Sequence, residues 1–346
     1  SAKGDTAYVC LSMKNCLAVV DLEKGAVKQE IETGIAPWDV ALMPDEKRVW
    51  VSNWGGRHPR KGERTALSAK SPVPVDERGI PVSGSVSLLN LTTGREVAQI
   101  ETGLHASDLL LSPDAKTLFV ANANADTVSL IDTEKHKVRE TLSVPPDLSL
   151  PYGSAPNALA LSPDQKTLYV ANGGNNAIAL FELTDARKGR RKLRGFIPAG
   201  WYPGALVSDA NALYVANVKG LGSRAAAQSS KGRNVYEYLG TFNRIPYPSP
   251  NELKKYTQQV KTDAQIPQIL RARERSLSEV APAPIPQNLG EPSLFEHVIY
   301  IIKENRTYDQ VFGDLKQGNG DSNLCLYPRF VTPNHHALVE QFVLLD

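Results

Sequence analysis

The sequence predicts an all-β protein built from a repeated four-stranded unit, and three observations support this prediction. First, a four-residue phrase recurs as Phe119–Asn122, Tyr169–Asn172 and Tyr214–Asn217, and in altered form as Trp50–Asn53. Second, an apolar run and a Pro-Asp turn precede three of these phrases. Third, helical periodicity is nearly absent before residue 250. A self-similar unit of roughly 40–50 residues is typical of a β-propeller or another repeat array.

Each unit is expected to contribute four short strands. The first strand ends in a tight reversal such as Ser112-Pro113-Asp114, because proline fixes φ at a turn corner and aspartate can cap the turn. The recurrent phrase is the second strand. An apolar run then forms the third strand, and the fourth strand ends at a glycine such as Gly34, Gly103 or Gly200. Four short strands separated by turn residues describe one propeller blade.

The phrases closely resemble the YVTN-type (YncE-like) β-propeller repeat, over about residues 1–249. We count about five units, of which the last is degenerate. Ser1–Val9 aligns with Ser162–Val170, so the chain is expected to begin inside a blade, after its first strand. Since propellers of this type usually have about seven blades, the resemblance implies that this chain is part of a larger ring. The alternative is a complete ring of five blades.

Composition limits the possible partners. The formal net charge is +2, which gives no global electrostatic argument for nucleic acid, and none is expected. No apolar run approaches the roughly 20 residues needed to cross a bilayer, so no membrane span is expected, and the first residues are not a signal peptide. Cys10 and Cys16 flank a predicted hairpin turn, and they either face one another across it or are unpaired core residues. No Cys-x-x-Cys-His motif is present, which disfavours a haem-bearing propeller.

Three features interrupt the regular repeat. Residues 55–84 are an insertion between the second and third strands of a blade, and they either reach over one face or form a solvated loop. Arg187–Arg194 is the densest positive run, either a solvated loop or an attraction for a phosphate-bearing partner. Trp38, Trp201 and Tyr202 follow the glycine that ends a blade, near the top face, where they either line a channel mouth or pack.

The composition changes after Pro246. Residues 251–262 have apolar residues at helical spacing, with Asn251 as the expected cap, and Ala281–Pro286 is expected to be an extended linker. We therefore expect a propeller over residues 1–249, a helix and proline-rich linker over 250–296, and the first elements of an α/β domain over 297–346.

His297–Ile302 is a nearly continuous apolar run, as expected for a strand buried in an α/β sheet. Glu304 and Asn305 follow it directly. Ligands gather at the carboxyl ends of such strands, and carboxylate and amide oxygens suit a divalent cation. From the residues alone, however, a Glu-Asn pair at this place is more simply a strand end.

Residues 302–309, with Phe312-Gly313, resemble the opening motif of the phosphoesterase family that includes phospholipase C and acid phosphatase members. That family has an alkaline-phosphatase-like α/β core. Residues 332–338 and 342–346 fit its next helix and strand. The resemblance implies that Glu304 and Asn305 hold a catalytic divalent metal ion. Asp309 matches a motif position without an assigned role, and Asp346 is a possible further site residue.

The implied activity of the parent enzyme is metal-assisted phosphoester hydrolysis, of the phosphatase or phospholipase C type. In the family, a hydroxyl nucleophile and further metal-binding acids follow later in the chain. We therefore expect these 346 residues alone to have no catalytic residue, to hold no metal tightly and to be inactive, with the remainder of the phosphoesterase or another protein as partner. His335 and His336 are adjacent on a helix and cannot readily share one metal, so His336 is expected to pack.

The alternative function is a non-catalytic propeller that binds a protein, glycan or cell-wall partner. A periplasmic or extracellular location follows from the resemblance alone.

Overall fold

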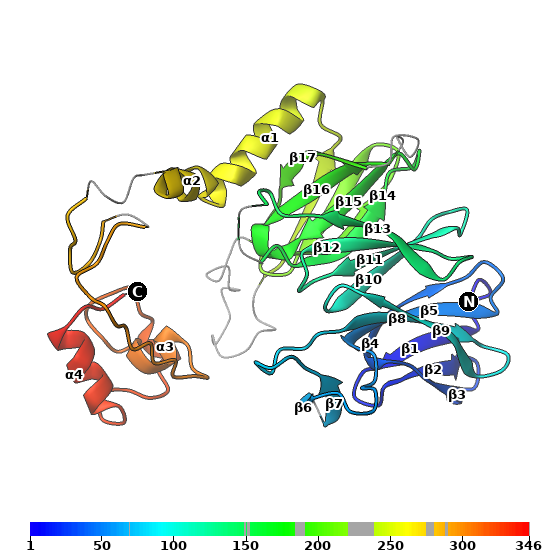
Figure 1. Ribbon diagram of the computed structural model, residues 1–346, viewed down its shortest axis with the longest axis horizontal. Coiled ribbons are helices and arrows are strands. Elements are labelled where there is room, and N and C mark those ends of the chain that lie inside the picture. Colours follow the sequence, from blue (N-terminus) through cyan, green and yellow to red (C-terminus); the bar gives the residue numbers. More distant parts are fainter. Residues whose placement is uncertain are drawn as a thin grey trace. The chain divides into compact units, whose positions relative to one another are not determined.

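Five antiparallel sheets follow one another in chain order through the first part of the molecule (Figure 1). The computed structural model describes residues 1–345 except 69, 149, 151–152, 184–190, 221–238, 275–279 and 288–289. The chain divides into two compact units. The first comprises Ser1–Gly222 and Gly240–Pro267, and the second comprises Ser223–Leu239 and Gln268–Asp346.

Three of the sheets have four strands each, which confirms the predicted repeat and the all-β class of this unit. Within each sheet the strands pair antiparallel in sequence order. The strands are β4 (Ile35–Leu42), β5 (Arg48–Gly56), β8 (Gly84–Asn90) and β9 (Arg95–Thr102); β10 (Ala106–Leu111), β11 (Thr117–Asn122), β12 (Thr127–Asp132) and β13 (Lys137–Ser143); and β14 (Pro156–Leu161), β15 (Thr167–Asn172), β16 (Ala177–Glu182) and β17 (Lys192–Pro198).

The first and last sheets have three strands each among the described residues. The first contains β1 (Thr6–Leu11), β2 (Cys16–Asp21) and β3 (Ala26–Glu32), and the last contains β18 (Pro203–Ser208), β19 (Ala212–Asn217) and β20 (Thr241–Pro246). β1 occupies the place of a second strand, as the alignment predicts. The five sheets are consistent with propeller blades, whereas the number of blades in the complete ring stays a prediction.

The core lies between consecutive sheets. One apolar cluster joins the sheet of β4 to the sheet of β10, and another joins the sheet of β10 to the sheet of β14. In the three four-stranded sheets the second and third strands are the most deeply buried, because each has a paired strand on both edges and a neighbouring sheet against its faces. Val51, Val120, Val170 and Val215, one from each recurrent phrase, are fully buried.

The recurrent asparagine and the blade-ending glycine depend on one another. The Asn122 amide is buried and donates to the hydroxyls of Thr127 and Ser129, at 3.0 and 2.9 Å. A Cβ atom on Gly103 would lie only 2.8 Å from the Asn122 side chain. The same close approach joins Gly34 to Asn53. Only glycine fits beside the asparagine side chain, which explains why the asparagine and the blade-ending glycine recur together.

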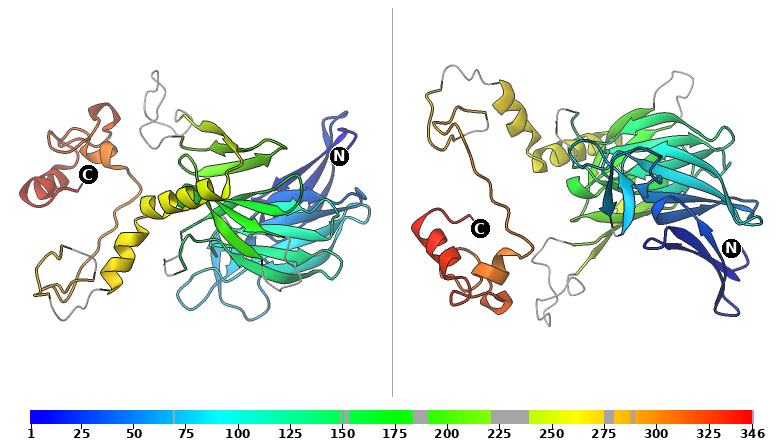
Figure 2. Two further views of the ribbon diagram at one scale, coloured as in Figure 1. Left: turned by 90° about the horizontal axis from the view of Figure 1, so that it is seen from above. Right: turned by 60° about the horizontal axis from the view of Figure 1, so that its bottom comes forward.

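The helix α1 (Pro250–Asp263) belongs to the first unit and packs on β17 (Figure 2). The prediction of this helix is confirmed, but the expected cap is wrong. Ser249 is the N-cap, since Ser249 and Glu252 form a reciprocal capping box with proline at the first helical position. Val260 is buried between α1 and the sheet.

The second unit contains short helices and irregular segments. Its elements are most of α2 (Ile266–Glu274), then α3 (Tyr308–Phe312), the 3₁₀ turn η5 (Ser322–Leu324) and α4 (Pro333–Gln341). α4 confirms the helix expected after Thr332. No helix of the described residues is long and apolar enough to cross a membrane.

The strand expected at His297–Ile302 is wrong for this structure. These residues form no strand, and the side chains of residues 298–302 are 71–89% exposed. Residues 342–345 also form no strand. A central strand of an α/β sheet needs paired strands on its edges and helices over its faces. The described residues of the second unit contain helices but no sheet, so they show no α/β sheet.

Candidate binding surface at the blade corners

Four inner strands begin at the same unusual backbone corner. Ala36, His105, Ala155 and Tyr202 have φ values of 52°, 55°, 48° and 58°, in the left-handed region that few residues other than glycine adopt. The loop between the second and third strands of the same unit contacts this corner. In the sheet of β10, for example, the Ala123 N–H donates to the His105 carbonyl at 3.0 Å. We call these corners and loops the rim. Its residues are 34–39, 53–58, 103–108, 122–126, 153–157, 173–176, 200–203 and 217–220.

Three aromatic rings are stacked on the rim. The Trp54 and His105 rings are parallel within 23°, with centroids 4.0 Å apart, and Trp38 lies 6.2 Å from Trp54 at 28°. Trp38 is 60% exposed and Trp54 is 39% exposed. Burial lowers the pKa of His105, so its ring is neutral at pH 7. The result is an exposed, uncharged aromatic surface that draws its rings from two consecutive sheets.

Trp201 and Tyr202 form a second aromatic part of the rim. Both are exposed, so neither belongs to the apolar core, and their expected place at a channel mouth stays a prediction. The Tyr202 ring lies against the backbone of Gly173, where a Cβ atom would come within 3.0 Å of the ring. The Tyr202 N–H donates to Asn176 Oδ1 at 2.9 Å. The tyrosine is thus fixed to the neighbouring blade.

A pair of carboxyl groups follows the aromatic stack. Asp39, directly after Trp38, accepts from the Leu109 N–H at 2.8 Å, and Asp108 accepts from the Leu159 N–H at 2.7 Å. Each carboxyl group therefore bridges one inner strand to the next. The two carboxyl groups lie close enough for each to change the pKa of the other. Two carboxyl groups in contact favour sharing one proton.

This contact changes the acidity of the pair. Burial, followed by the nearby Asp39 charge, raises the pKa of Asp108 to about 7. Burial also raises the pKa of Asp39. The nearest titratable neighbour on β1 is Cys10, whose pKa is raised to about 12 by burial and by Asp39. The pair therefore titrates in two coupled steps, of which the later one lies near neutral pH.

The insertion at residues 55–84 is anchored at the rim by part of its length. Its hairpin consists of β6 (Thr65–Ser68), which is exposed, and β7 (Ser71–Pro74). Val73 and Val75 pack on Ile35 and Ala36. The Arg57 guanidinium is buried and forms two hydrogen bonds with Glu63, at 2.7 and 2.6 Å. Part of the insertion therefore packs against the rim, and the insertion is not only a solvated loop.

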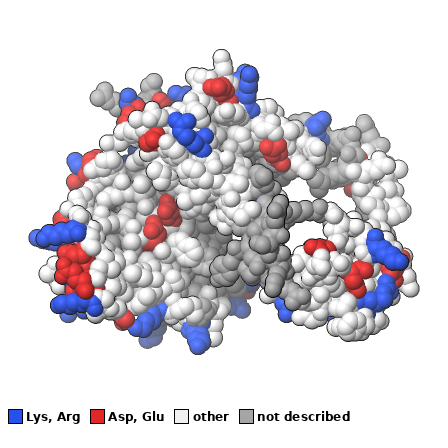
Figure 3. All heavy atoms as spheres, turned by 180° about the vertical axis from the view of Figure 1, so that it is seen from behind, with Lys and Arg blue, Asp and Glu red and all other residues white. Residues whose placement is uncertain are grey.

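Charged side chains of both signs are scattered over the surface (Figure 3). The middle of the first unit on this side is mostly uncharged, with acidic atoms beside a hollow. Part of the basic run lies outside the described residues, namely 187–190. Arg191 pairs with Glu140, and Arg194 pairs with Glu182 at 2.5 Å. Because both charges are neutralised within the propeller, these two arginines give little support to a phosphate-bearing partner.

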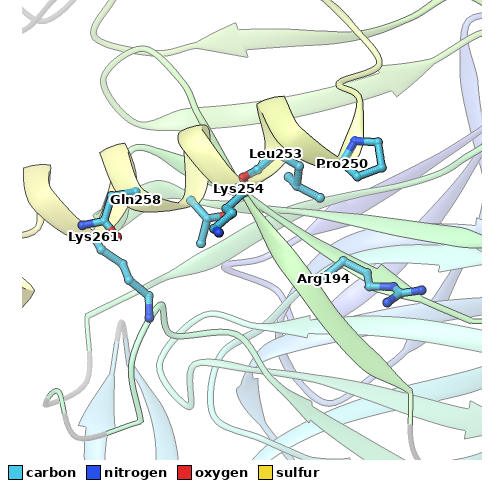
Figure 4. A pocket seen from close by; sticks show the side chains of 7 residues that line it. Arg194, Pro250, Leu253, Lys254, Gln258 and Lys261 are labelled. Carbon is cyan, nitrogen blue, oxygen red and sulfur yellow. The ribbon is translucent and has the colours of Figure 1, made fainter.

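A shallow groove of about 510 Å³ lies between α1 and β17. Its polar lining residues are Arg194, Lys254, Thr257, Gln258 and Lys261, and Arg194 and Lys261 lie at opposite ends of the view in Figure 4. The groove is open and has few apolar walls beyond Leu253 and Pro250. It is a weaker candidate than the rim, which combines exposed rings with acceptor groups.

The sequence-predicted metal ligands are not part of any cluster that the structure describes. Glu304 and Asn305 are exposed, and Asp346 lies outside the described residues. Asp309 accepts from the Asp321 N–H at 2.8 Å and thereby organises the loop after α3. Among the described residues, no group of three or more His, Cys, Asp or Glu side chains could hold a metal ion.

His336 packs, as the adjacent-histidine argument predicts. It is fully buried, and its Nε2 lies 2.8 Å from Asp314 Oδ1. His335 instead lies 2.8 Å from the Lys303 amine. The three cysteines are free: Cys10 pairs in register with Leu17 and not with Cys16, so the disulfide alternative is wrong.

Comparison with known proteins supports the propeller in the middle of the chain. Residues 60–187 match the family described as YNCE-like beta-propeller. This stretch is similar to that family. No curated protein matches the chain.

Two similar solved structures have low identity. Kuenenia stuttgartiensis hydrazine synthase is 18% identical, with 71% of this chain and 82% of that chain covered and a TM-score of 0.41. Dihydro-heme d1 dehydrogenase NirN in complex with DHE is 14% identical, with 62% of this chain and 40% of that chain covered and a TM-score of 0.44. Similarities at this level say nothing about the ligand or activity of this chain.

Sequence reasoning found Trp38, Trp201 and Tyr202 on the rim but missed Trp54, His105, Asp39 and Asp108. The available signal was positional. Asp39 and Asp108 each lie six residues before the Asp of the following Pro-Asp turn, at Asp45 and Asp114, so the repeat places them on neighbouring inner strands.

Proposed function

We propose that the first unit is a binding module that recognises a glycan through the rim. The observation that carries this proposal is the exposed stack of Trp38, Trp54 and His105. Large aromatic side chains contribute most to protein stability when they are buried. Two tryptophans held in parallel at the surface therefore point to a ligand that covers them.

The chemistry of the rim favours a sugar. One face of a sugar ring carries C–H groups that can lie flat on an aromatic ring, while its hydroxyl groups donate hydrogen bonds. The rim supplies acceptors for such donors: the Asp39–Asp108 pair and Asn157 Oδ1, a buried oxygen without a partner among the described residues. Sites of this kind combine apolar or aromatic walls with a few placed polar groups.

This proposal predicts that Trp38→Ala and Trp54→Ala each weaken glycan binding by roughly 10- to 30-fold, as is typical for a central aromatic contact. A glycan array would identify the ligand, and titration calorimetry would compare the variants. Phe242→Ala is the matched control, because Phe242 is an exposed aromatic residue on β20 that stacks on Tyr214 and is not one of the rim residues. Binding that survives both tryptophan substitutions, or a glycan array on which the chain binds no glycan, would contradict the proposal.

The second candidate function is that the chain is part of a metal-dependent phosphoesterase. It is supported by the motif of residues 302–313. Glu304 and Asn305 supply only two oxygen ligands, whereas a hard cation takes about six. The described residues do not complete such a site, so no catalytic step is derived from it. A periplasmic or extracellular location would accompany this function.

For the chain of 346 residues, this candidate predicts no metal-dependent turnover of p-nitrophenyl phosphate. This candidate also predicts that a longer form of the chain, with a nucleophile and further metal ligands, is active and that Glu304→Ala reduces its kcat by about 10- to 100-fold, since a group that holds the metal would be lost. Glu296→Ala is the control, because Glu296 is exposed and lies outside the motif. If Glu304→Ala had no effect in an active longer chain, the assignment would be wrong.

A further inference from the structure

The register of the insertion hairpin, β6 and β7, decides which of its backbone groups point outward. Directly beside the two strands, the Val75 N–H donates to the Arg64 carbonyl at 3.0 Å, so these two residues are a hydrogen-bonded pair. Hydrogen-bonded and non-hydrogen-bonded pairs alternate along an antiparallel ladder. Ala66 therefore bonds to β7, whereas the N–H and C=O groups of Thr65 and Leu67 point away from it.

The outer edge of β7 is closed to another strand. The residues of β7 that point outward are Pro72 and Pro74, which have no N–H to donate. The Pro74 carbonyl already accepts from the Val82 N–H at 3.2 Å, and Val75 forms a bridge with Pro81. Proline and a covering loop are two of the ways in which natural proteins protect a sheet edge.

The outer edge of β6 has neither kind of protection. β6 consists of Thr-Ala-Leu-Ser, without a charge or a proline, and all four residues are exposed. Among the described residues, no strand pairs with its outer side. Leu67 is 79% exposed and lies opposite the exposed Pro72, so an apolar spot adjoins the open edge. A sheet of two strands is marginally stable, and a third strand would strengthen it.

Uncompensated positive charge flanks this open edge. Arg64 and Lys70 lie beyond the two ends of β6, and both are exposed. The Arg64 guanidinium donates to the Glu77 backbone carbonyl at 3.1 Å. Within the described part of the chain, neither residue forms an ion pair, in contrast to other arginines of the insertion, which pair with acids: Arg57 with Glu63, Arg60 with Glu101 and Arg78 with Asp76.

We propose that the outer edge of β6 binds an extended segment of a partner protein, one with acidic residues at both ends and apolar residues between them. This inference goes beyond glycan binding at the rim, and neither depends on the other. Strand addition to an open sheet edge is an established mode of recognition, in which main-chain hydrogen bonds give affinity and side-chain contacts give specificity. Complementary charge would favour the acidic partner over others.

A second copy of this chain fits the edge less well. Antiparallel pairing of two β6 strands would bring Arg64 of one copy close to Lys70 of the other. Like charges on opposite residues of a ladder destabilise it. An acidic segment turns the same two positions into attractive pairs, which is why the proposal specifies a different protein.

The probe for the test is the labelled peptide Glu-Val-Thr-Val-Thr-Val-Glu, added to the full chain. Alternate residues of a strand share a face, so its valines can lie beside Leu67 while its glutamates lie toward Arg64 and Lys70. We expect saturable binding in fluorescence anisotropy. Hydrogen exchange should become at least tenfold slower at the Thr65 and Leu67 amides and change little at Ala66, whose amide already bonds to β7.

Two variants of the chain separate the backbone contribution from the charge contribution. Leu67→Pro removes an outward N–H and leaves the bonds to β7 intact, so it should weaken binding at least tenfold without changing the unfolding midpoint. Arg64→Glu with Lys70→Glu should reverse the preference, so that the peptide Lys-Val-Thr-Val-Thr-Val-Lys binds better than the acidic one. Lys135→Glu, the same charge change at the turn between β12 and β13, is the control and should keep the original preference.

Four results would overturn the proposal. One is unchanged exchange at Thr65 and Leu67 with saturating peptide. Another is equal binding of the acidic and basic peptides to the unaltered chain. A third is undiminished binding of an acidic peptide whose backbone nitrogens are N-methylated on the edge that faces β6, which tests the pairing even if Leu67→Pro does not fold. The fourth is protection of β6 that rises with protein concentration without peptide, which would assign the edge to a second copy.

Discussion

The substitution Asp108→Asn should stabilise the protein above pH 7 and have little effect at pH 4. The pKa of Asp108 is raised from 3.8 to about 7 in the folded state, so its protonated form is favoured by folding. This contribution to stability is fully present below about pH 4 and is lost as the pH rises through 7. Asparagine keeps an acceptor for the Leu159 N–H and places a donor toward Asp39, without a charge.

The expected gain at pH 8 is on the order of 2 kcal/mol, discounted for partial solvent exposure, or roughly 5 °C in Tm. Thermal unfolding from pH 4 to 8 would measure it. Asp114→Asn is the control with the opposite sign, because the Ser112 hydroxyl and a backbone N–H lower the pKa of Asp114, and losing that charge should destabilise the protein at pH 8. A parallel pH dependence of wild type and Asp108→Asn would contradict the shared-proton description.

Trp50→Ala should destabilise the first unit by about 3–5 kcal/mol, as large-to-small substitutions of buried aromatic residues do. Trp50 is fully buried between the sheets of β4 and β10, and its Nε1–H donates to Met43 Sδ at 3.3 Å. Alanine would leave a cavity at the interface between two blades. Urea unfolding followed by circular dichroism would measure the loss.

Trp50→Phe is the matched variant, because the repeat uses Phe119 and Tyr169 at the same position. It should lose only about 1 kcal/mol, since the ring volume is largely kept. Trp201→Ala removes an exposed tryptophan and should change stability by less than about 1 kcal/mol. A loss below 1 kcal/mol for Trp50→Ala would show that the core does not lie between these sheets.

The repeat was predictable because several local rules agree at each of its positions. The Asn122 amide needs a neighbouring hydroxyl group as acceptor, and its side chain leaves room only for glycine at position 103. The turn at Ser112–Asp114 joins β10 to β11. These requirements act over short distances and therefore leave a periodic pattern in the sequence. The same alignment also predicted that β1 is the second strand of its unit.

The rim and the segment at His297–Ile302 were harder to predict, for different reasons. The stack of Trp38, Trp54 and His105 joins residues from two blades, and no local pattern encodes which rings meet across a blade boundary. For His297–Ile302, composition gives a strong β propensity. A strand nevertheless forms only where it pairs with another strand, and the described residues of the second unit contain no other strand.

The most direct test of the rim as a binding surface is hydrogen exchange of the chain with and without a saturating glycan chosen by array. Slower exchange at residues 34–39, 53–58 and 103–108 is the predicted result. Protection confined to the outer strands β9 and β13, or to residues 297–345, would contradict it.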